Sequence, residues 1–93
     1  MKFTFTGRKM EVTDALRAYA EKKLSKLDRY FASDAEAQVT FHTERGRDTA
    51  EVTVRSANMY FRAQKTANDM YAAIDSVQDM IERQIRKNKT RLE

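Results

Sequence analysis

Cysteine and proline are missing from this chain of 93 residues, and histidine occurs only once. Without cysteine, the chain has no disulfide framework, thiolate metal ligand or thiol nucleophile. A single histidine argues against the common histidine-rich metal sites and against Ser-His-Asp catalysis. The sequence contains no run of about 18 apolar residues that would cross a membrane, and residues 1–7 contain no apolar core of a secretion signal. The sequence therefore predicts a cytoplasmic protein without a membrane partner.

Length and composition together predict one small domain. A chain of this size buries about two-thirds of the surface that its unfolded form exposes, which supports one core of two layers. Hydrophobic residues make up 41% and charged residues 34% of the chain, as is typical of a compact domain rather than a disordered one. No linker, repeat or low-complexity stretch divides the sequence. Residues 1–93 are therefore predicted to form a single domain.

The first third of the chain has the pattern of a strand followed by a helix. Residues 2–6 alternate between apolar and polar side chains, as in a half-buried strand. Residues 14–31 carry large apolar residues at helical spacing, and Thr13 precedes them as a suitable N-cap. Gly7 is expected in the turn between the two elements.

Three alternating segments and a second helix complete the pattern. Between residues 38 and 64, three segments alternate between apolar and polar residues, and turns are expected at residues 46–48 and 56–58. The last segment carries one apolar stripe along a long helix, for which Asn68 or Asp69 is the expected cap. The stripe consists of Met70, Ile74, Val77, Ile81, Ile85 and, at its end, Leu92.

These elements predict an α+β fold of two layers in the order β-α-β-β-β-α. A four-stranded sheet with one apolar face can be covered by two helices that each carry one apolar stripe. The other sheet face carries threonine, glutamine, histidine, glutamate and arginine, with Tyr60 as its one clear aromatic residue. An RNA-recognition-motif domain needs aromatic residues on its open sheet face, so this pattern argues against that class.

Basic residues are concentrated on one flank of each predicted helix. The formal net charge of the chain is +4, and the basic excess falls in residues 1–31 and 82–93. At about 100° per residue, three cations of the first helix lie about 220° to 280° from Leu16, and three of the second lie about 220° to 300° from Met70. They are Lys22, Lys26 and Arg29 in the first helix and Arg83, Lys87 and Arg91 in the second.

Two interpretations of these basic flanks are open. Lysine and arginine on rigid helices can pair with phosphates and release condensed counterions, which favours a nucleic-acid partner. Alternatively, the flanks are solvated helix faces whose charges complement the helix dipole. The sorting is similar on both helices, although Arg86, at about 160° from Met70, blurs it on the second, and this similarity favours nucleic acid. Lys23 lies inside the apolar stripe, where its stem could pack at the edge of the core and its ammonium could sit at the mouth of a groove between the helices.

No set of residues in the sequence indicates catalysis. The chain has no glycine-rich phosphate loop, nucleophile elbow or set of metal ligands at the required spacing. His42 has no second histidine near it and is expected on the polar sheet face. Asp75 and Asp79 are one helical turn apart, and carboxylates at that spacing on a charged face are usually solvated. The sequence therefore predicts no enzyme, no cofactor, no metal ion and no small-molecule substrate.

Three stretches of the chain together resemble one known family. They are residues 7–31, which include Glu-Lys-Lys-Leu-Ser-Lys-Leu, the string Asp-Met-Tyr-Ala-Ala-Ile-Asp at residues 69–75, and Glu-Arg-Gln-Ile-Arg-Lys-Asn-Lys at residues 82–89. The chain resembles the ribosome hibernation promoting factors, also called ribosome-associated inhibitors or sigma-54 modulation proteins. The resemblance covers nearly the whole chain, although residues 36–66 match in pattern more than in identity. It implies a fold related to double-stranded-RNA-binding domains, in the element order predicted above.

The resemblance also implies a function and a site. Members of the family bind the small ribosomal subunit in the channel between head and body, over the mRNA and tRNA sites, and silence ribosomes in stationary phase or stress. The implied partners are 16S rRNA and the neighbouring ribosomal proteins. The RNA-binding residues carried over by position are Lys22, Lys23, Lys26, Arg29, Arg83, Arg86, Lys87 and Lys89, and the angular argument adds Arg91.

Other functions and a longer protein are alternatives that the sequence leaves open. The chain could instead be a protein-interaction module that acts on a sigma factor or another partner, or a general binder of double-stranded RNA. Long members of the family carry a second, C-terminal domain that dimerises and pairs ribosomes, and this chain does not include it. The chain is therefore either a short member or the N-terminal part of a longer protein. Ribosome dimerisation is expected only with that further domain.

Overall fold

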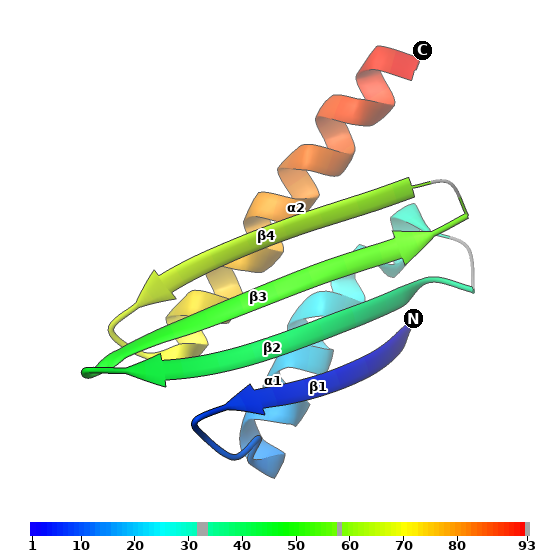
Figure 1. Cartoon of the computed structure of the whole chain (residues 1–93). Helices are drawn as coiled ribbons and strands as arrows, with labels where there is room; N and C mark the ends of the chain where they lie inside the picture. The colour runs from blue at the N-terminus through cyan, green and yellow to red at the C-terminus, as the bar shows by residue number, and fades with distance from the viewer. Residues whose placement is uncertain (32–33, 58, 93) are drawn as a thin grey trace.

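Four strands and two helices follow one another in the predicted order in the computed structural model (Figure 1). The structure describes residues 1–31, 34–57 and 59–92, with side chains described as far as residue 88. Its elements are β1 (Lys2–Arg8), α1 (Asp14–Leu24), the 3₁₀ helix η1 (Ser25–Tyr30), β2 (Glu36–Glu44), β3 (Arg47–Ser56), β4 (Met59–Ala67) and α2 (Met70–Leu92). The predicted α+β class and its order β-α-β-β-β-α are confirmed.

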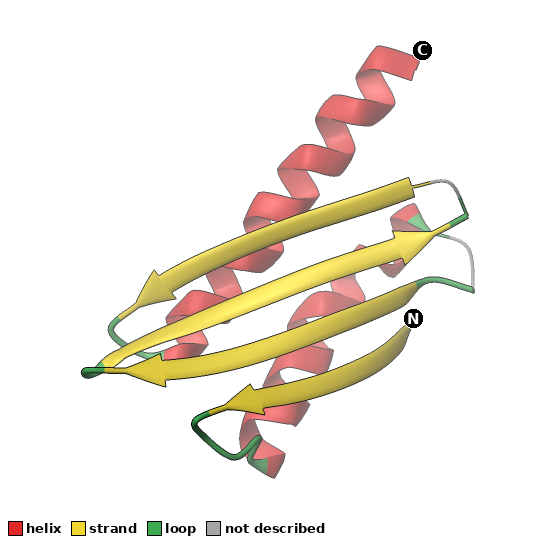
Figure 2. Ribbon diagram, in the orientation of Figure 1, coloured by secondary structure: helices red, strands yellow, loops and turns green. Residues whose placement is uncertain are grey.

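The sheet is mixed, with the strand order β1-β2-β3-β4. β1 pairs with β2 in parallel, so the chain crosses from one strand to the other through α1 and η1. β2, β3 and β4 form an antiparallel meander. Both helices lie on the same face of the sheet, and α2 extends beyond it toward the C-terminus (Figures 1 and 2). One sheet face is therefore covered and the other is open.

The core lies between the sheet and the helices, where inward-facing strand residues meet the helical stripes. Its largest fully buried side chains are Leu24 and Leu27 before β2, Val39, Phe41, Val52 and Val54 in the sheet, and Ile74, Val77 and Ile81 in α2. Burying each of them stabilises the fold by about 1.5–3 kcal/mol. The predicted α2 stripe is confirmed from Met70 to Ile85, and the side chain of Leu92 lies outside the described ones. Over the described residues, neither helix has an apolar stretch that would span a membrane.

The predicted α-helix over residues 14–31 is wrong in its second half. The α-helical turns end at Leu24, and the following residues wind as the 3₁₀ helix η1. Leu24, Leu27 and Tyr30 are three residues apart, and a helix with three residues per turn aligns them on one side. Leu24 and Leu27 are fully buried, so the tighter winding keeps this row of side chains against the core.

Two turns differ from the sequence prediction. Gly7 lies inside β1 opposite Phe41, and a Cβ atom on it would be only 2.3 Å from the carbonyl oxygen of Met10. The turn between β2 and β3 consists of Arg45 and Gly46, one residue earlier than expected, with φ angles of 54° and 75°. This is a two-residue hairpin whose twist matches that of the strands. Arginine at the first position hides the signal, because asparagine or aspartate is the usual residue there.

The helix caps agree with the sequence. The side chain of Thr13 accepts a hydrogen bond of 3.1 Å from the backbone N–H three residues later, at the start of α1. Asp69, rather than Asn68, caps α2 in the same way with a bond of 2.9 Å. The turn expected at residues 56–58 joins β3 to β4, and its Asn58 lies outside the described residues.

Candidate nucleic-acid interface

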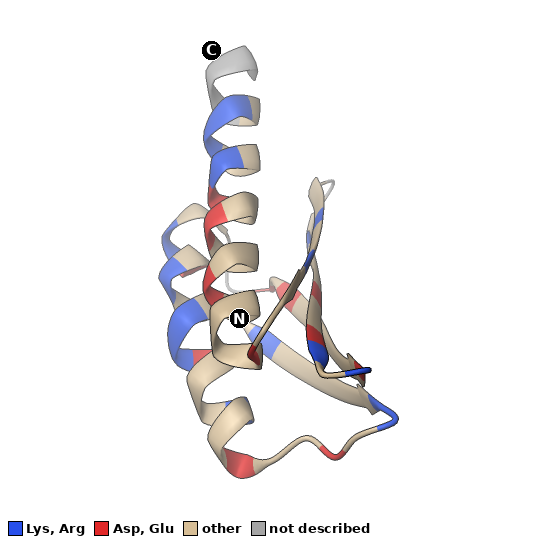
Figure 3. Cartoon of the chain, turned by 90° about the vertical axis from the view of Figure 1, so that its left-hand side faces the viewer, with Lys and Arg blue, Asp and Glu red and all other residues tan. Residues whose placement is uncertain are grey.

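Lysine and arginine residues of the helices gather on the side of the helix layer that faces away from the sheet (Figure 3). Among the nine predicted RNA-binding residues, six are exposed and Lys23 is half-buried. The six exposed residues are Lys22, Lys26, Arg29, Arg83, Arg86 and Lys87. The side chains of Lys89 and Arg91 lie outside the described ones. We call the seven described residues the basic surface.

Helical periodicity places the six exposed cations away from the buried stripe. α1 buries Leu16 and Leu24, so Lys22 lies on the outer flank of the helix. In η1 the period of three residues puts Lys26 and Arg29 on one side of the chain. The angles expected for Lys26 and Arg29 in a continuous α-helix therefore do not apply, although the exposure of both residues agrees with the prediction.

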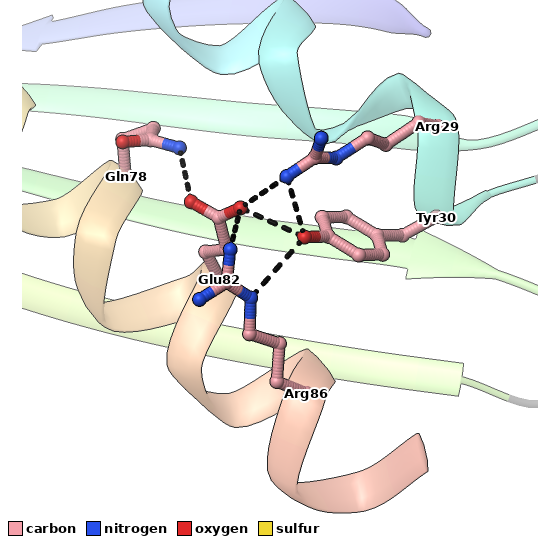
Figure 4. A network of polar contacts seen from close by, with 5 residues as sticks. All are labelled: Arg29, Tyr30, Gln78, Glu82 and Arg86. Carbon is pink, nitrogen blue, oxygen red and sulfur yellow. Dashed lines mark hydrogen bonds and ion pairs between the residues drawn. The ribbon is translucent and has the colours of Figure 1, made fainter.

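The basic segments of η1 and α2 meet at one carboxylate, Glu82 (Figure 4). Its Oε2 atom accepts hydrogen bonds from Tyr30 Oη at 2.7 Å, Arg29 Nη2 at 2.8 Å and Arg86 Nη2 at 3.1 Å. Its Oε1 atom accepts a hydrogen bond from Gln78 Nε2 at 3.2 Å. Because Arg29 comes from η1 and Arg86 from α2, a single oxygen atom joins the two basic segments.

Tyr30 is the second centre of this network. Its hydroxyl donates to Glu82 and accepts hydrogen bonds from Arg29 Nη2 at 2.9 Å and from Arg86 Nε at 3.4 Å. The guanidinium of Arg29 also lies over the ring of Tyr30, 4.9 Å from its centre, which is a cation–π distance. Tyr30 therefore orders both arginines without adding a charge of its own.

Hydrogen bonding keeps the groups of this network ionised. The side chain of Glu82 is 17% exposed, and the hydrogen bonds from Tyr30 and Arg29 lower its pKa from 4.5 to about 2. The pKa of Arg29 is raised, first by its hydrogen bond to Tyr30 and then by that to Glu82. The pKa of Arg86 is also raised, chiefly by its hydrogen bond to Tyr30. The two cations and one anion together leave a positive cluster at neutral pH.

A second carboxylate, Asp75, joins α1 to α2. Its Oδ1 atom accepts a hydrogen bond from Tyr19 Oη at 2.7 Å and lies 3.4 Å from Lys23 Nζ. Hydrogen bonding to Asp75 raises the pKa of Tyr19, whose ring packs edge-on against Tyr71. The side chain of Lys23 is 28% exposed, and its ammonium lies 5.7 Å from the centre of the Tyr19 ring. Lys23 thus packs at the edge of the core and also bridges the two helices.

The remaining cations of the basic surface are more accessible. Arg83 forms an ion pair of 2.6 Å with Asp79, but both side chains are mostly exposed and such a pair contributes little to stability. Within the described ranges, no carboxylate lies at ion-pair distance from Lys22, Lys26 or Lys87. These three side chains can therefore meet phosphates without breaking an internal ion pair.

Sequence reasoning missed the residues that join the two basic segments. Tyr19 and Tyr30 are among the large residues at helical spacing in residues 14–31, so the periodicity assigns them to the core. In the structure both are half-buried, with their hydroxyls bonded to carboxylates. Sequence reasoning treats Asp75 as a solvated carboxylate, and the side chain is 47% exposed, but the sequence does not reveal its bonds to Tyr19 and Lys23. It also gives Glu82 no role. The partners in these contacts are 56 and 52 residues apart, so no local spacing could reveal them.

Among the described residues, the open sheet face has no second charged centre of this kind. His42 lies there as expected, with Nε2 3.4 Å from the carboxylate of Glu44. Arg62 pairs with Glu51 across the neighbouring strands, which neutralises both charges. In the part of the chain that the structure describes, no group of three histidine, aspartate or glutamate side chains is arranged to hold a metal ion.

Comparison with known proteins identifies the family. Residues 3–93 match the family described as sigma 54 modulation protein / S30EA ribosomal protein. The chain belongs to this S30EA family. The resemblance noted in the sequence is thereby confirmed.

Curated relatives of this S30EA chain carry the name ribosome hibernation promotion factor. The factor of Lactococcus lactis subsp. cremoris is 46% identical over 96 residues, which cover 99% of this chain and 51% of the relative. The factor of Deinococcus radiodurans is 43% identical over 95 residues, with 96% of this chain and 49% of the relative covered. The chain spans about half the length of the curated relatives that it matches.

Solved structures share the fold of this S30EA chain closely. The N-terminal domain of Thermus thermophilus Protein Y has a TM-score of 0.86 at 36% identity, covering 94% of this chain and 98% of the other. A ribosomal subunit interface protein from Coxiella burnetii has a TM-score of 0.85 at 25% identity, covering 97% and 99%. RNA binding by the nine selected residues is a prediction that these similarities do not test.

Proposed function

We propose that residues 1–93 form a ribosome-binding domain that occupies the mRNA and tRNA channel of the small ribosomal subunit and silences translation in stationary phase or stress. The observation that carries this proposal is the basic surface, in which cations of η1 and α2 converge on Glu82. The names of the curated relatives and of the Coxiella protein support the ribosome as the target. The proposed partners are 16S rRNA and adjacent ribosomal proteins in the cytoplasm.

The proposed mechanism is competition for space rather than catalysis. A folded domain with a basic surface fills a groove lined with phosphates, and mRNA and tRNA cannot occupy the same groove. Recognition then depends on charge and shape, with little reading of base sequence. If about six phosphates are neutralised, the logarithm of the binding constant falls with the logarithm of salt concentration at a slope of about −4 to −5.

A protein-interaction module is the main alternative, and the described surface gives it little support. Such a module would need an exposed apolar patch. Among the described residues, the exposed large hydrophobic side chains are Tyr60 and Tyr71, and they come from different elements, β4 and α2. The exposed cations Arg29 and Arg86, in contrast, come from different helical segments and meet at Glu82. A nucleic-acid partner is therefore favoured.

Charge reversal at the accessible lysines tests the proposal. We expect the triple change Lys22→Glu, Lys26→Glu and Lys87→Glu to weaken binding to purified 30S subunits at least about 100-fold. A small change in thermal unfolding is expected, because all three side chains are exposed. Binding is measured by co-sedimentation at fixed salt.

A matched control variant shows whether binding depends on the position of the cations or only on the net charge of the chain. Lys2, Arg8 and Arg47 are exposed on the strand side, and reversing all three to glutamate changes the net charge by the same amount. We expect this control to lose much less affinity for 30S subunits than the helix variant. Equal losses in the two variants would contradict the assignment of the interface to the helices.

A further inference from the structure

Glu82 places a negative charge inside the basic surface, and the inference drawn from it rests on the proposed function. A carboxylate in this place repels the phosphates of RNA. It is nevertheless mostly buried and accepts four hydrogen bonds. Two of its donors are Arg29 and Arg86, whose side chains are each 65% exposed and belong to different helical segments.

We propose that Glu82 and Tyr30 are positioning residues that hold Arg29 and Arg86 together as one site for a phosphate group of RNA. The Nη2 atoms of both arginines lie within 3.1 Å of the same carboxylate oxygen, so the two guanidinium groups are neighbours. In the described contacts with Glu82 and Tyr30, Arg29 uses only Nη2, which leaves Nε and Nη1 for a phosphate. Guanidinium groups match phosphate in geometry, which favours this ligand.

In this arrangement the side chains of Arg29 and Arg86 are already ordered before RNA binds. An arginine on a helix surface samples many rotamers, and immobilising one at an interface lowers affinity by about two- to tenfold. Glu82 and Tyr30 impose the order on both arginines in the free protein. We therefore expect loss of the positioning groups to weaken RNA binding by about tenfold.

The sign of the effect distinguishes positioning from charge alone. Glu82→Gln removes a negative charge from the basic surface, so simple electrostatics predicts tighter binding to RNA. Positioning predicts weaker binding. Asp79→Asn removes the same charge one turn earlier on α2, from an exposed carboxylate whose described ion pair is with Arg83. This control variant should bind as tightly as the original chain or more tightly.

Tyr30→Phe provides a second test without any change in charge. It removes the hydroxyl that bonds Glu82, Arg29 and Arg86 and keeps the ring. The carboxylate of Glu82 is retained in Tyr30→Phe, so this variant tests the proposal even if Glu82→Gln lowers the stability of the folded chain. We expect Tyr30→Phe to weaken binding several-fold in the same direction as Glu82→Gln.

The experiment is co-sedimentation of the original chain and the three variants with 30S subunits over a salt series, below each unfolding midpoint. We expect Glu82→Gln to bind about tenfold more weakly, with a salt slope shallower by about one, because one phosphate contact is lost. A purely structural role would not change the slope. Equal or tighter binding by Glu82→Gln, weaker binding with an unchanged slope, or full binding by Tyr30→Phe would each overturn the proposal.

A titration with inorganic phosphate separates failure of the inference from failure of the proposed function. In the ¹⁵N-labelled chain, the Nε–H signals of Arg29 and Arg86 should shift together with phosphate, and Glu82→Gln should abolish this shared response. A shared response without 30S binding would refute the ribosome as the target and retain the phosphate site. Binding to 30S with independent or absent arginine responses would refute the site alone.

Discussion

The carboxylate of Glu82 should make the stability of this protein depend on pH in the acid range. Its pKa in the folded chain is about 2, below the ordinary 4.5, because Tyr30 and Arg29 donate hydrogen bonds to the ionised form. A carboxyl group whose pKa is lowered by folding stabilises the folded chain at every pH above the pKa of the unfolded chain. This stabilisation disappears as the pH falls from about 4.5 toward 2. The change Glu82→Gln removes the ionisable group and nearly preserves the shape of the side chain.

The size of the effect follows from the pKa shift and from the exposure of the partners. At about 1.4 kcal/mol per pKa unit, the shift from 4.5 to about 2 corresponds to at most about 3.5 kcal/mol of unfolding free energy. Arg29 and Arg86 are 65% exposed, so solvent screens part of the interaction. We expect Glu82→Gln to lose about 1–2 kcal/mol at pH 7 and almost nothing near pH 2.

Urea unfolding of both proteins between pH 7 and pH 2 measures this difference. The two free energies of unfolding should differ most above pH 5 and converge as the pH falls. Asp79→Asn serves as a control, because its exposed ion pair with Arg83 should contribute less than about 1 kcal/mol. A difference that stays constant with pH, or no difference at pH 7, would refute the reasoning about the Glu82 network.

Two further changes test the local geometry. Gly7→Ala places a Cβ atom 2.3 Å from the backbone oxygen of Met10, and we expect a loss of about 2 kcal/mol or more in chemical unfolding. Unchanged stability would mean that the β1–α1 connection relaxes freely. Thr13→Ala removes the N-cap of α1 and should lower the unfolding free energy by about 1 kcal/mol, whereas Thr13→Ser should retain most of it. Equal losses in the alanine and serine variants would contradict the capping role.

Hydrophobic periodicity was sufficient to predict the order of elements and most of the core. The alternating strands and the α2 stripe from Met70 to Ile85 depend on which face each residue occupies, and one face of each element is buried. Cap residues such as Thr13 and Asp69 act on backbone groups three residues away, so they are also visible in a local reading. The buried faces and the caps are predictable because each depends on residues that are close together in the sequence.

Periodicity could not predict the contacts that give the basic surface its form. The hydrogen bond from Tyr30 to Glu82 joins residues 52 positions apart and depends on how η1 lies against α2. The change from α to 3₁₀ winding after Leu24 also escapes a pattern based on apolar residues, because a spacing of three suits both helices. The exposure of Lys22 and Lys87, in contrast, follows from α-helical angles, since these side chains need only point away from the core.

Co-sedimentation of the chain with purified 30S subunits over a salt series, with excess RNA duplex as competitor, tests ribosome binding most directly. The proposed function predicts saturation near one copy per subunit, resistance to the duplex, and a salt slope of about −4 to −5. Binding that the duplex removes would instead indicate a general binder of double-stranded RNA. Absence of binding at low salt would contradict the ribosome as the target of this domain.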